Sequence, residues 1–257
     1  MPTPLDVLHA SVERLRSIVA PLDDDAITTP AYPTEWSIAQ VVSHLGSAAI
    51  IFGRRLDDGL AGLETPDDFA PEVWAGWDAK SPRAQVDDGL AADAALLARI
   101  EGLDDAERAR VSFSMGPLLF DHDGFVGLRV NEHVVHTWDV EVALDPTAVL
   151  PAEATALLVD QLGLIAGFTA RAAGEPGSIV VDTTDPARRF AITVAEDGAT
   201  FAGVVDADQR SSAAADLVLP AEALCRLVYG RLDPDHTPAG VDDGEVLARL
   251  RAVFPGA

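Results

Sequence analysis

The chain has 257 residues, of which 48% are hydrophobic, so it can bury one large core or two modest ones. Its 42 acidic residues outnumber 18 basic ones, and a formal net charge of -24 disfavours nucleic acid and anionic membrane surfaces as partners. A single cysteine excludes an internal disulfide and cysteine-rich metal clusters, and no apolar run suits a signal segment or a membrane span, so we expect a cytoplasmic protein.

Apolar residues at helical spacing predict four long helices in the first part of the chain. Ser37 is a suitable N-terminal cap for the second helix, and Asp121 or Asp123 for the fourth. Four such helices predict a bundle. Their approximate ranges are 4–20, 37–59, 85–101 and 123–144.

Two segments between these helices lack a clear period. Residues 64–82 mix Pro and Asp with Trp74 and Trp77, which predicts a loop or a broken helix that could cover a pocket. Residues 111–120 are predicted to be irregular or partly extended.

After a predicted fifth helix at 152–173, the hydrophobic period changes towards two beyond Gly174. The pair Asp197-Gly198 is a strong hairpin signal. This pattern predicts an α+β domain, so we expect two domains, residues 1–150 and 151–257. The predicted strands of the α+β domain are 178–182, 189–196, 200–205 and 216–219, and the predicted helices that follow or flank them are 221–229 and 243–253.

Three side chains in the helical part form a candidate metal site. Glu132 and His136 are four residues apart, so they point within about 40° of each other on one helix. His44 lies beside the apolar stripe of the second helix, and antiparallel packing could bring it to the other two. Two imidazoles and one carboxylate are a ligand set of open catalytic zinc sites.

Each of these residues also has an ordinary interpretation. A Glu and a His at this spacing often form a solvated pair by chance, and a lone histidine such as His44 is often a hydrogen-bonded core residue. His133 faces about 100° away from Glu132, so we leave it outside the site. His122 stands at a helix start, where capping and solvent contacts explain it.

Two stretches of sequence decide between these interpretations. The segments WSIAQVVSHL (36–45) and RVNEHVVHTWD (129–139) resemble the two signature stretches of the mycothiol-dependent maleylpyruvate isomerase family. That pattern is a Trp-Ser/Thr helix start with His eight residues after the Trp, followed later by Arg-x-x-Glu-x-x-x-His-x-x-Asp. A segment at 227–232 is similar to a Gly-Arg segment of the same family.

The resemblance implies a fold and a cofactor. It implies an all-α, DinB-like four-helix bundle that binds a divalent metal, zinc foremost, through His44, Glu132 and His136. A small α+β domain that resembles sterol-carrier folds would follow it.

It also implies an activity. Mycothiol would be the low-molecular-weight thiol cosubstrate, activated as a metal-bound thiolate that attacks a small electrophile, with isomerisation or S-transfer as the outcome. The alternative is a non-catalytic, metal-containing module that binds a small ligand or a protein.

Four further residues each have a possible role in the site or an ordinary structural role. Arg231 is the candidate for pairing with a substrate carboxylate. The alternative is that it lies on the surface and pairs with a nearby aspartate. Asp139 could orient His136, and Arg129 could neutralise Glu132 or Asp139, unless either is only a helix-face ion pair. Cys225 lies in an apolar helical run and is interpreted as a small buried residue.

Overall fold

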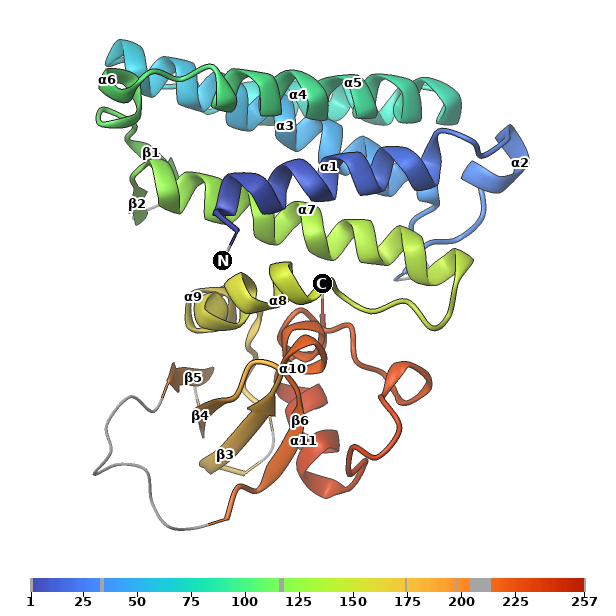
Figure 1. The fold of residues 1–257 in the computed structure, drawn as a ribbon, viewed down its shortest axis with the longest axis vertical. Coiled ribbons are helices and arrows are strands. Elements are labelled where there is room, and N and C mark those ends of the chain that lie inside the picture. Colours follow the sequence, from blue (N-terminus) through green and yellow to red (C-terminus); the bar gives the residue numbers. More distant parts are fainter. Residues whose placement is uncertain are drawn as a thin grey trace. The chain divides into compact units, whose positions relative to one another are not determined.

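The computed structural model describes residues 2–32, 35–115, 118–173, 175–196, 198–203 and 214–256. The chain divides into two compact units, Met1–Ala148 and Val149–Ala257. Figure 1 shows a first unit built mainly of helices and a second that combines helices with a sheet. This agrees with the predicted fold class, a helical bundle followed by an α+β region.

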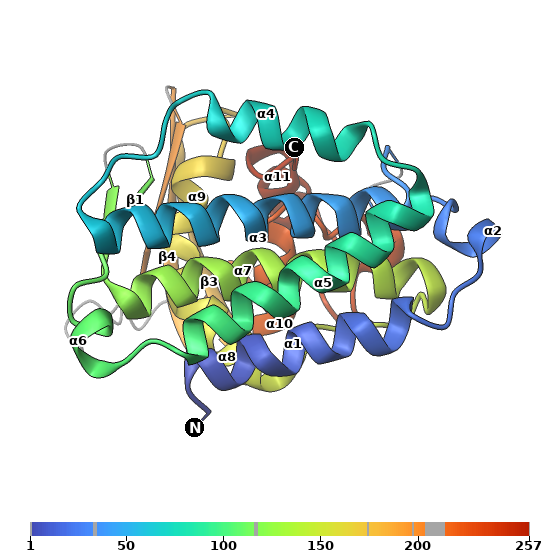
Figure 2. The ribbon, with the colours of Figure 1, turned by 90° about the horizontal axis from the view of Figure 1, so that it is seen from above.

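Four long helices form the bundle of the first unit: α1 (Pro4–Val19), α3 (Ile38–Ala61), α5 (Pro82–Glu101) and α7 (His122–Leu144). Helix α3 contacts α5 and α7, and α1 also contacts α5 and α7, so each of the four helices packs against two others. Figure 2 shows these helices from above. Helix α4 (Phe69–Asp78) lies against α3. The smaller elements are α2 (Asp24–Ile27), α6 (Asp105–Arg108) and the hairpin of β1 (Phe113–Met115) and β2 (Leu118–Phe120).

Local sequence explains where the bundle helices begin. Ser37 accepts a hydrogen bond from the Gln40 backbone, and the Gln40 side chain accepts one from the Ser37 backbone, which completes a capping box at the start of α3. Asp121 caps α7 in the predicted way, through the backbone N–H of Gly124. These caps fix the starting points of the two helices that carry the candidate site.

Two glycines allow α3 and α5 to approach closely. A Cβ atom added to Gly46 would lie 2.6 Å from the Cα of Gly89, and one added to Gly89 would lie 2.7 Å from the carbonyl oxygen of Val42. Trp77 packs over the same contact, since its ring lies 2.5 Å from that added Gly46 Cβ. The absence of side chains at these positions therefore sets the spacing of the two helices.

The second unit is a mixed four-stranded sheet with helices. The strand order is β5-β4-β3-β6, with β3 and β6 parallel and the other neighbours antiparallel. Helix α9 contacts β5, and α10 contacts β3 and β6. The elements are α8 (Ala152–Leu158), η1 (Val159–Gln161), α9 (Leu162–Thr169), β3 (Gly177–Thr184), β4 (Arg188–Ala195), β5 (Gly198–Gly203), β6 (Leu217–Pro220), α10 (Ala221–Val228), η2 (Pro234–His236) and α11 (Glu245–Val253).

Some predicted elements differ from the observed ones. The single helix expected at 152–173 is divided into α8, a 3₁₀ turn and α9. The segment 64–82 contains the ten-residue helix α4, with Pro71 in its first turn, where the missing N–H costs no helical hydrogen bond. Asp197 of the predicted hairpin and positions 204 and 205 of the predicted third strand lie outside the described residues.

Within the described part of the chain, no helix combines the length and the apolar character that crossing a bilayer requires.

Candidate metal centre

Helices α3 and α7 bring three potential ligands together. On α7, Nε2 of His136 lies 3.8 Å from Oε2 of Glu132, one helical turn away. From α3, Nε2 of His44 lies 3.3 Å from the same oxygen. One ligand atom from each of the three residues falls within 4.8 Å of the others. The structure thus joins residues that are 88 positions apart in the sequence.

The donor set and its spacing fit a divalent cation. Ligand atoms about 2.1 Å from a shared tetrahedral ion lie about 3.4 Å from one another, so small side-chain movements would suffice. The side chains are 32% (His44), 40% (Glu132) and 14% (His136) exposed, which leaves access from solvent. Three ligands with an accessible side resemble an open site more than a closed structural one.

Asp139 holds one of the imidazoles in place. Its Oδ2 lies 2.8 Å from Nδ1 of His136, and its side chain is completely buried. An ionised carboxylate can only accept, so Nδ1 carries the proton, and in the neutral imidazole the lone pair then lies on Nε2, on the side of Glu132. This is the orienting role that the sequence suggested for Asp139.

The charge environment keeps Glu132 ionised. Burial raises the pKa of its carboxyl group, but the hydrogen bond with His44 and the charges of His136, His44 and Arg129 outweigh this and lower the pKa to about 2. The carboxylate is therefore available as an anionic ligand across the physiological pH range.

Arg129 differs from its expected role. Its guanidinium pairs with Asp93 of α5 and donates to the carbonyl oxygen of Leu45 at 3.0 Å, instead of pairing with Glu132 or Asp139. Arg129 and Asp93 are both 1% exposed, so this is a buried ion pair behind the site. Its charge still contributes to the low pKa of Glu132.

His133 belongs to this buried network. Its Nε2 lies 3.3 Å from Oδ2 of Asp93, and its Nδ1 lies 2.8 Å from the Ser11 hydroxyl of α1. The network therefore connects all four bundle helices, and His133 bonds to α1 and α5 instead of joining the three candidate ligands, as its helical angle predicts.

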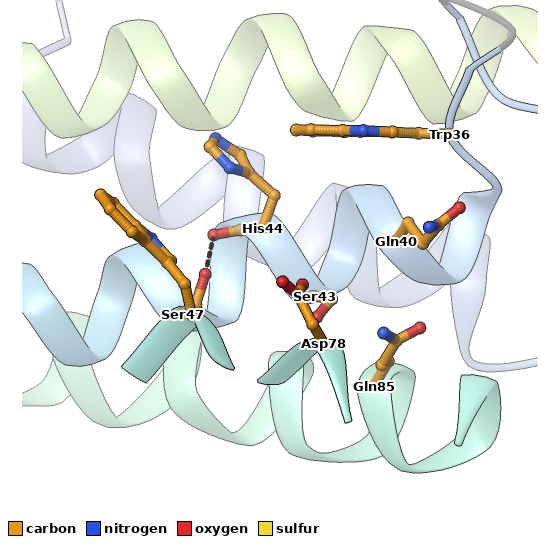
Figure 3. Close-up of a pocket in the computed structure, with 8 residues that line it drawn as sticks. Trp36, Gln40, Ser43, His44, Ser47, Asp78 and Gln85 are labelled. Atoms are coloured by element: carbon orange, nitrogen blue, oxygen red, sulfur yellow. Dashed lines mark hydrogen bonds between the residues drawn. The ribbon is translucent and has the colours of Figure 1, made fainter. Parts of the chain in front are cut away.

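A cavity of about 630 Å³ adjoins the site (Figure 3). His44 is part of its wall, and the ring of Trp36 lies 5.2 Å from that of His44 and stacks 6.3 Å from that of His136. Trp74 also lines the cavity and is 49% exposed, whereas Trp77 is buried, with Nζ of Lys80 3.6 Å from its ring centre. In the segment 64–82, which was expected to cover a pocket, Trp74 lies in the cavity wall and Trp77 does not.

Of the cavity residues that the sequence did not reveal, three lie on α3. Gln40, Ser43 and Ser47 line the cavity together with His44, from the same face of α3. The sequence could have revealed them through their spacing, because Ser43, His44 and Ser47 follow Gln40 at i+3, i+4 and i+7. This pattern marks one polar stripe along a helix that is otherwise largely apolar.

The remaining candidate residues lie in the second unit. Arg231 is 9% exposed, so it is not a surface arginine, and its Nη1 donates to the carbonyl oxygen of Tyr229 at 2.7 Å. Cys225 is fully buried, and burial raises the pKa of its thiol, as expected of an unreactive core cysteine.

Comparison with known proteins identifies the family that the two sequence stretches resemble. A family model described as the mycothiol maleylpyruvate isomerase N-terminal domain matches residues 8–141, slightly more than half of the chain. No curated protein matches in a sequence search.

Two solved structures share the fold. The crystal structure of the mycothiol-dependent maleylpyruvate isomerase matches with a TM-score of 0.64 at 15% identity, covering 90% of this chain and 92% of that one. A histidine-to-alanine mutant of that enzyme matches with the same TM-score and coverage at 14% identity.

Proposed function

Because the chain belongs to the mycothiol maleylpyruvate isomerase family, we propose that it is an enzyme that uses a divalent metal and mycothiol to act on a small electrophile. The observation that carries this proposal is the convergence of His44, Glu132 and His136 from two helices beside an open cavity. Residues 1–150 would form the metal-binding domain, with residues 151–257 as a second domain.

The three ligands have distinct tasks in this proposal. A bound cation would supply Lewis acidity, which lowers the pKa of a thiol that coordinates it. Glu132 contributes negative charge, and the two histidines contribute neutral nitrogens, a set suited to zinc in the absence of cysteine ligands. Asp139 keeps the Nε2 lone pair of His136 directed to the site.

The proposed chemistry needs no oxidant or reductant. A thiolate that adds to a double bond conjugated to a carbonyl group leaves an enolate and a single bond that can rotate. Expulsion of the same thiolate restores the double bond in the other geometry, which is isomerisation. Protonation of the enolate instead leaves a thioether, which is S-transfer.

Arg231 is the residue we propose for a substrate carboxylate. Its guanidinium offers a planar pair of N–H donors, and the chain as a whole is strongly acidic, so a cationic group suited to an anionic substrate is scarce. The test is Arg231→Lys, which keeps the charge but loses the bidentate geometry. We expect a higher KM for a dicarboxylate electrophile and an unchanged KM for an uncharged one.

The alternative is a metal-containing module without turnover. The partly exposed ligands and the adjoining cavity favour an enzyme, since structural metal sites are closed by four protein ligands.

The deciding experiment incubates the metal-loaded chain with mycothiol and a panel of electrophiles that includes maleylpyruvate. Isomerised product or a stable thioether would each support the enzyme, and would separate isomerase from S-transferase. The His44→Ala variant should be inactive, while His122→Ala, a partly buried histidine at the start of α7 that lies outside the candidate ligand set, serves as the matched control. No reaction with any member of the panel would favour the non-catalytic module.

A further inference from the structure

A long loop in the second unit carries Arg231. It joins α10 to α11 over residues 229–244 (Figure 1), and in this fully described stretch the one regular element is the 3₁₀ turn η2. A loop of this length leaves many backbone carbonyl groups without helix or sheet partners, so other groups must satisfy those that are buried. The contacts that hold the loop in one conformation therefore determine where Arg231 lies.

The loop leaves α10 through a tight turn around Gly230. The N–H of Gly230 donates to the carbonyl oxygen of Leu227 at 2.8 Å, and Gly230 has a φ of +73°, the left-handed conformation that glycine adopts at little cost. The N–H of Arg231 donates to the carbonyl oxygen of Arg226 at 2.7 Å. This pair of bonds is the common glycine-ended helix stop, so the local sequence fixes where the loop begins.

The side chain of Arg226 on α10 holds the loop from within the fold. It is 3% exposed, and its Nε and Nη2 form a bidentate ion pair with Glu222, one turn earlier on the helix, at 2.8 and 2.9 Å. Its Nη1 donates to two loop carbonyl oxygens, that of His236 at 2.9 Å and that of Arg231 at 3.4 Å. One buried guanidinium thus ties the backbone of Arg231 to a point five residues further along the loop.

Arg251 holds the same loop from α11. Its Nε donates to the carbonyl oxygen of Leu232 at 2.6 Å, and its Nη2 donates to the hydroxyl of Thr237 at 2.5 Å. Its Nη1 pairs with the carboxylate of Asp243, near the end of the loop. The three nitrogens of this one group therefore bind three separate points of the loop, which the planar fork of a guanidinium permits and a single ammonium nitrogen does not.

The loop also directs the side chain of Arg231. Its Nη1 donates to the carbonyl oxygen of Tyr229 at 2.7 Å, and both ends of this bond belong to the loop. The guanidinium is therefore placed by the loop backbone. An arginine that binds a carboxylate through two parallel hydrogen bonds needs a defined plane and position, so a displaced loop would bind the carboxylate less tightly.

We propose that Arg226 and Arg251 are positioning residues that hold Arg231 in place for a substrate carboxylate. The inference rests on the proposed function, because it uses the role given there to Arg231. The two guanidiniums bind the carbonyl groups of Arg231 itself and of the next residue, Leu232. They therefore act on the backbone at the point from which the proposed substrate-binding side chain extends, without contact between either of them and the substrate.

The test titrates maleate, a dicarboxylate whose binding is measured without turnover, into the metal-loaded full chain and follows binding by calorimetry. Arg251→Lys keeps the charge but loses the fork, so maleate should bind at least about fivefold more weakly, the equivalent of one lost hydrogen bond. Arg249→Lys is the matched control. Arg249 lies two residues earlier on α11 and donates to the carbonyl oxygen of Glu175, outside the loop, so its substitution should leave maleate affinity unchanged.

Two further measurements separate positioning from a general effect on the fold. Hydrogen exchange in residues 229–237 should be faster in Arg251→Lys and in Arg226→Lys than in the unmodified chain, and unchanged in Arg249→Lys. Adding Arg251→Lys to Arg231→Lys should weaken maleate binding no further, because Arg251 acts through Arg231. The same loss of affinity in both backgrounds would overturn the inference.

The outcomes distinguish this inference from the proposed function. If Arg231→Lys weakens maleate binding and Arg251→Lys does not, the positioning role is wrong while the carboxylate-binding role of Arg231 stands. Faster loop exchange in Arg251→Lys without weaker binding would mean that these contacts serve stability alone, which also overturns the inference. If maleate does not bind, or binds equally to the unmodified chain and Arg231→Lys, the proposed role of Arg231 is itself wrong.

Discussion

His136 and Asp139 are joined by a 2.8 Å hydrogen bond between Nδ1 and a carboxylate oxygen that is buried from solvent. The two residues are three positions apart on α7, so the helix itself maintains the contact. The bond fixes both the orientation of the imidazole and the nitrogen that is left to bind a cation.

Asp139→Asn should weaken metal binding without abolishing it. The asparagine amide no longer holds the imidazole with an ionic hydrogen bond, and losses of about 10- to 100-fold are typical when such a partner is removed. Competition with a chelator of known affinity measures the change. Asp123→Asn is the matched control, because Asp123 pairs with His122 at 2.9 Å on the exposed start of the same helix. An unchanged affinity in Asp139→Asn would rule out the orienting role.

The buried pair of Asp93 and Arg129 should be essential for stability. Asp93→Asn removes one partner and leaves the other charge buried, which costs about 3–5 kcal/mol in comparable cases. Urea unfolding at neutral pH measures the loss. Asp57→Asn is the control, since Asp57 of α3 and Arg99 of α5 form an exposed pair, also between two bundle helices, worth about 0–1 kcal/mol. Equal effects of the two substitutions would contradict this account.

The same pair predicts how stability responds to acid. Burial raises the pKa of Asp93, but the charges of Arg129 and His133 prevail and lower it. A carboxyl with a depressed pKa stabilises the fold above its unfolded pKa of about 3.9, and this contribution is lost as the pH falls through the lower, folded value. The difference in unfolding free energy between the unmodified chain and Asp93→Asn should therefore be constant near neutrality and shrink below about pH 3.9. A difference that is the same at every pH would disprove the assignment.

Gly89→Ala should destabilise the bundle although alanine is the better helix former. The new Cβ would lie 2.7 Å from the backbone oxygen of Val42, so α3 and α5 would have to separate, at a cost of about 1–3 kcal/mol for such overpacking. Gly53→Ala on α3 is the control: its nearest neighbour is 3.7 Å away, and helix propensity predicts a gain of up to about 1 kcal/mol. Thermal unfolding compares the two, and stabilisation by both would show that the helices are not in close contact.

The sequence predicts the bundle well because its long helices carry both a hydrophobic period and caps. Ser37 and Asp121 begin their helices at the expected residues. The break between α8 and α9 was not predictable in this way, since the apolar pattern continues through it and no Pro or Gly marks the 3₁₀ turn itself.

The site was predictable in part. Helical spacing places Glu132 and His136 on one face, but spacing alone cannot say that α3 and α7 are neighbours in the bundle. The motif resemblance supplied that step for His44. The partner of Arg129 escaped prediction because Asp93 is 36 residues away and carries no local signal, and the role of Gln40 and Ser43 depends on a cavity that forms only when α3, α4 and α5 pack together.

The central claim is that His44, Glu132 and His136 bind one divalent cation. Elemental analysis of the full chain, purified without chelator or metal-affinity tag, tests it most directly. We expect about one divalent ion per chain, zinc foremost, as in three-ligand catalytic sites. The ion should be lost in His44→Ala and in His136→Ala but retained in His122→Ala. Unchanged metal content in both ligand variants would contradict the account.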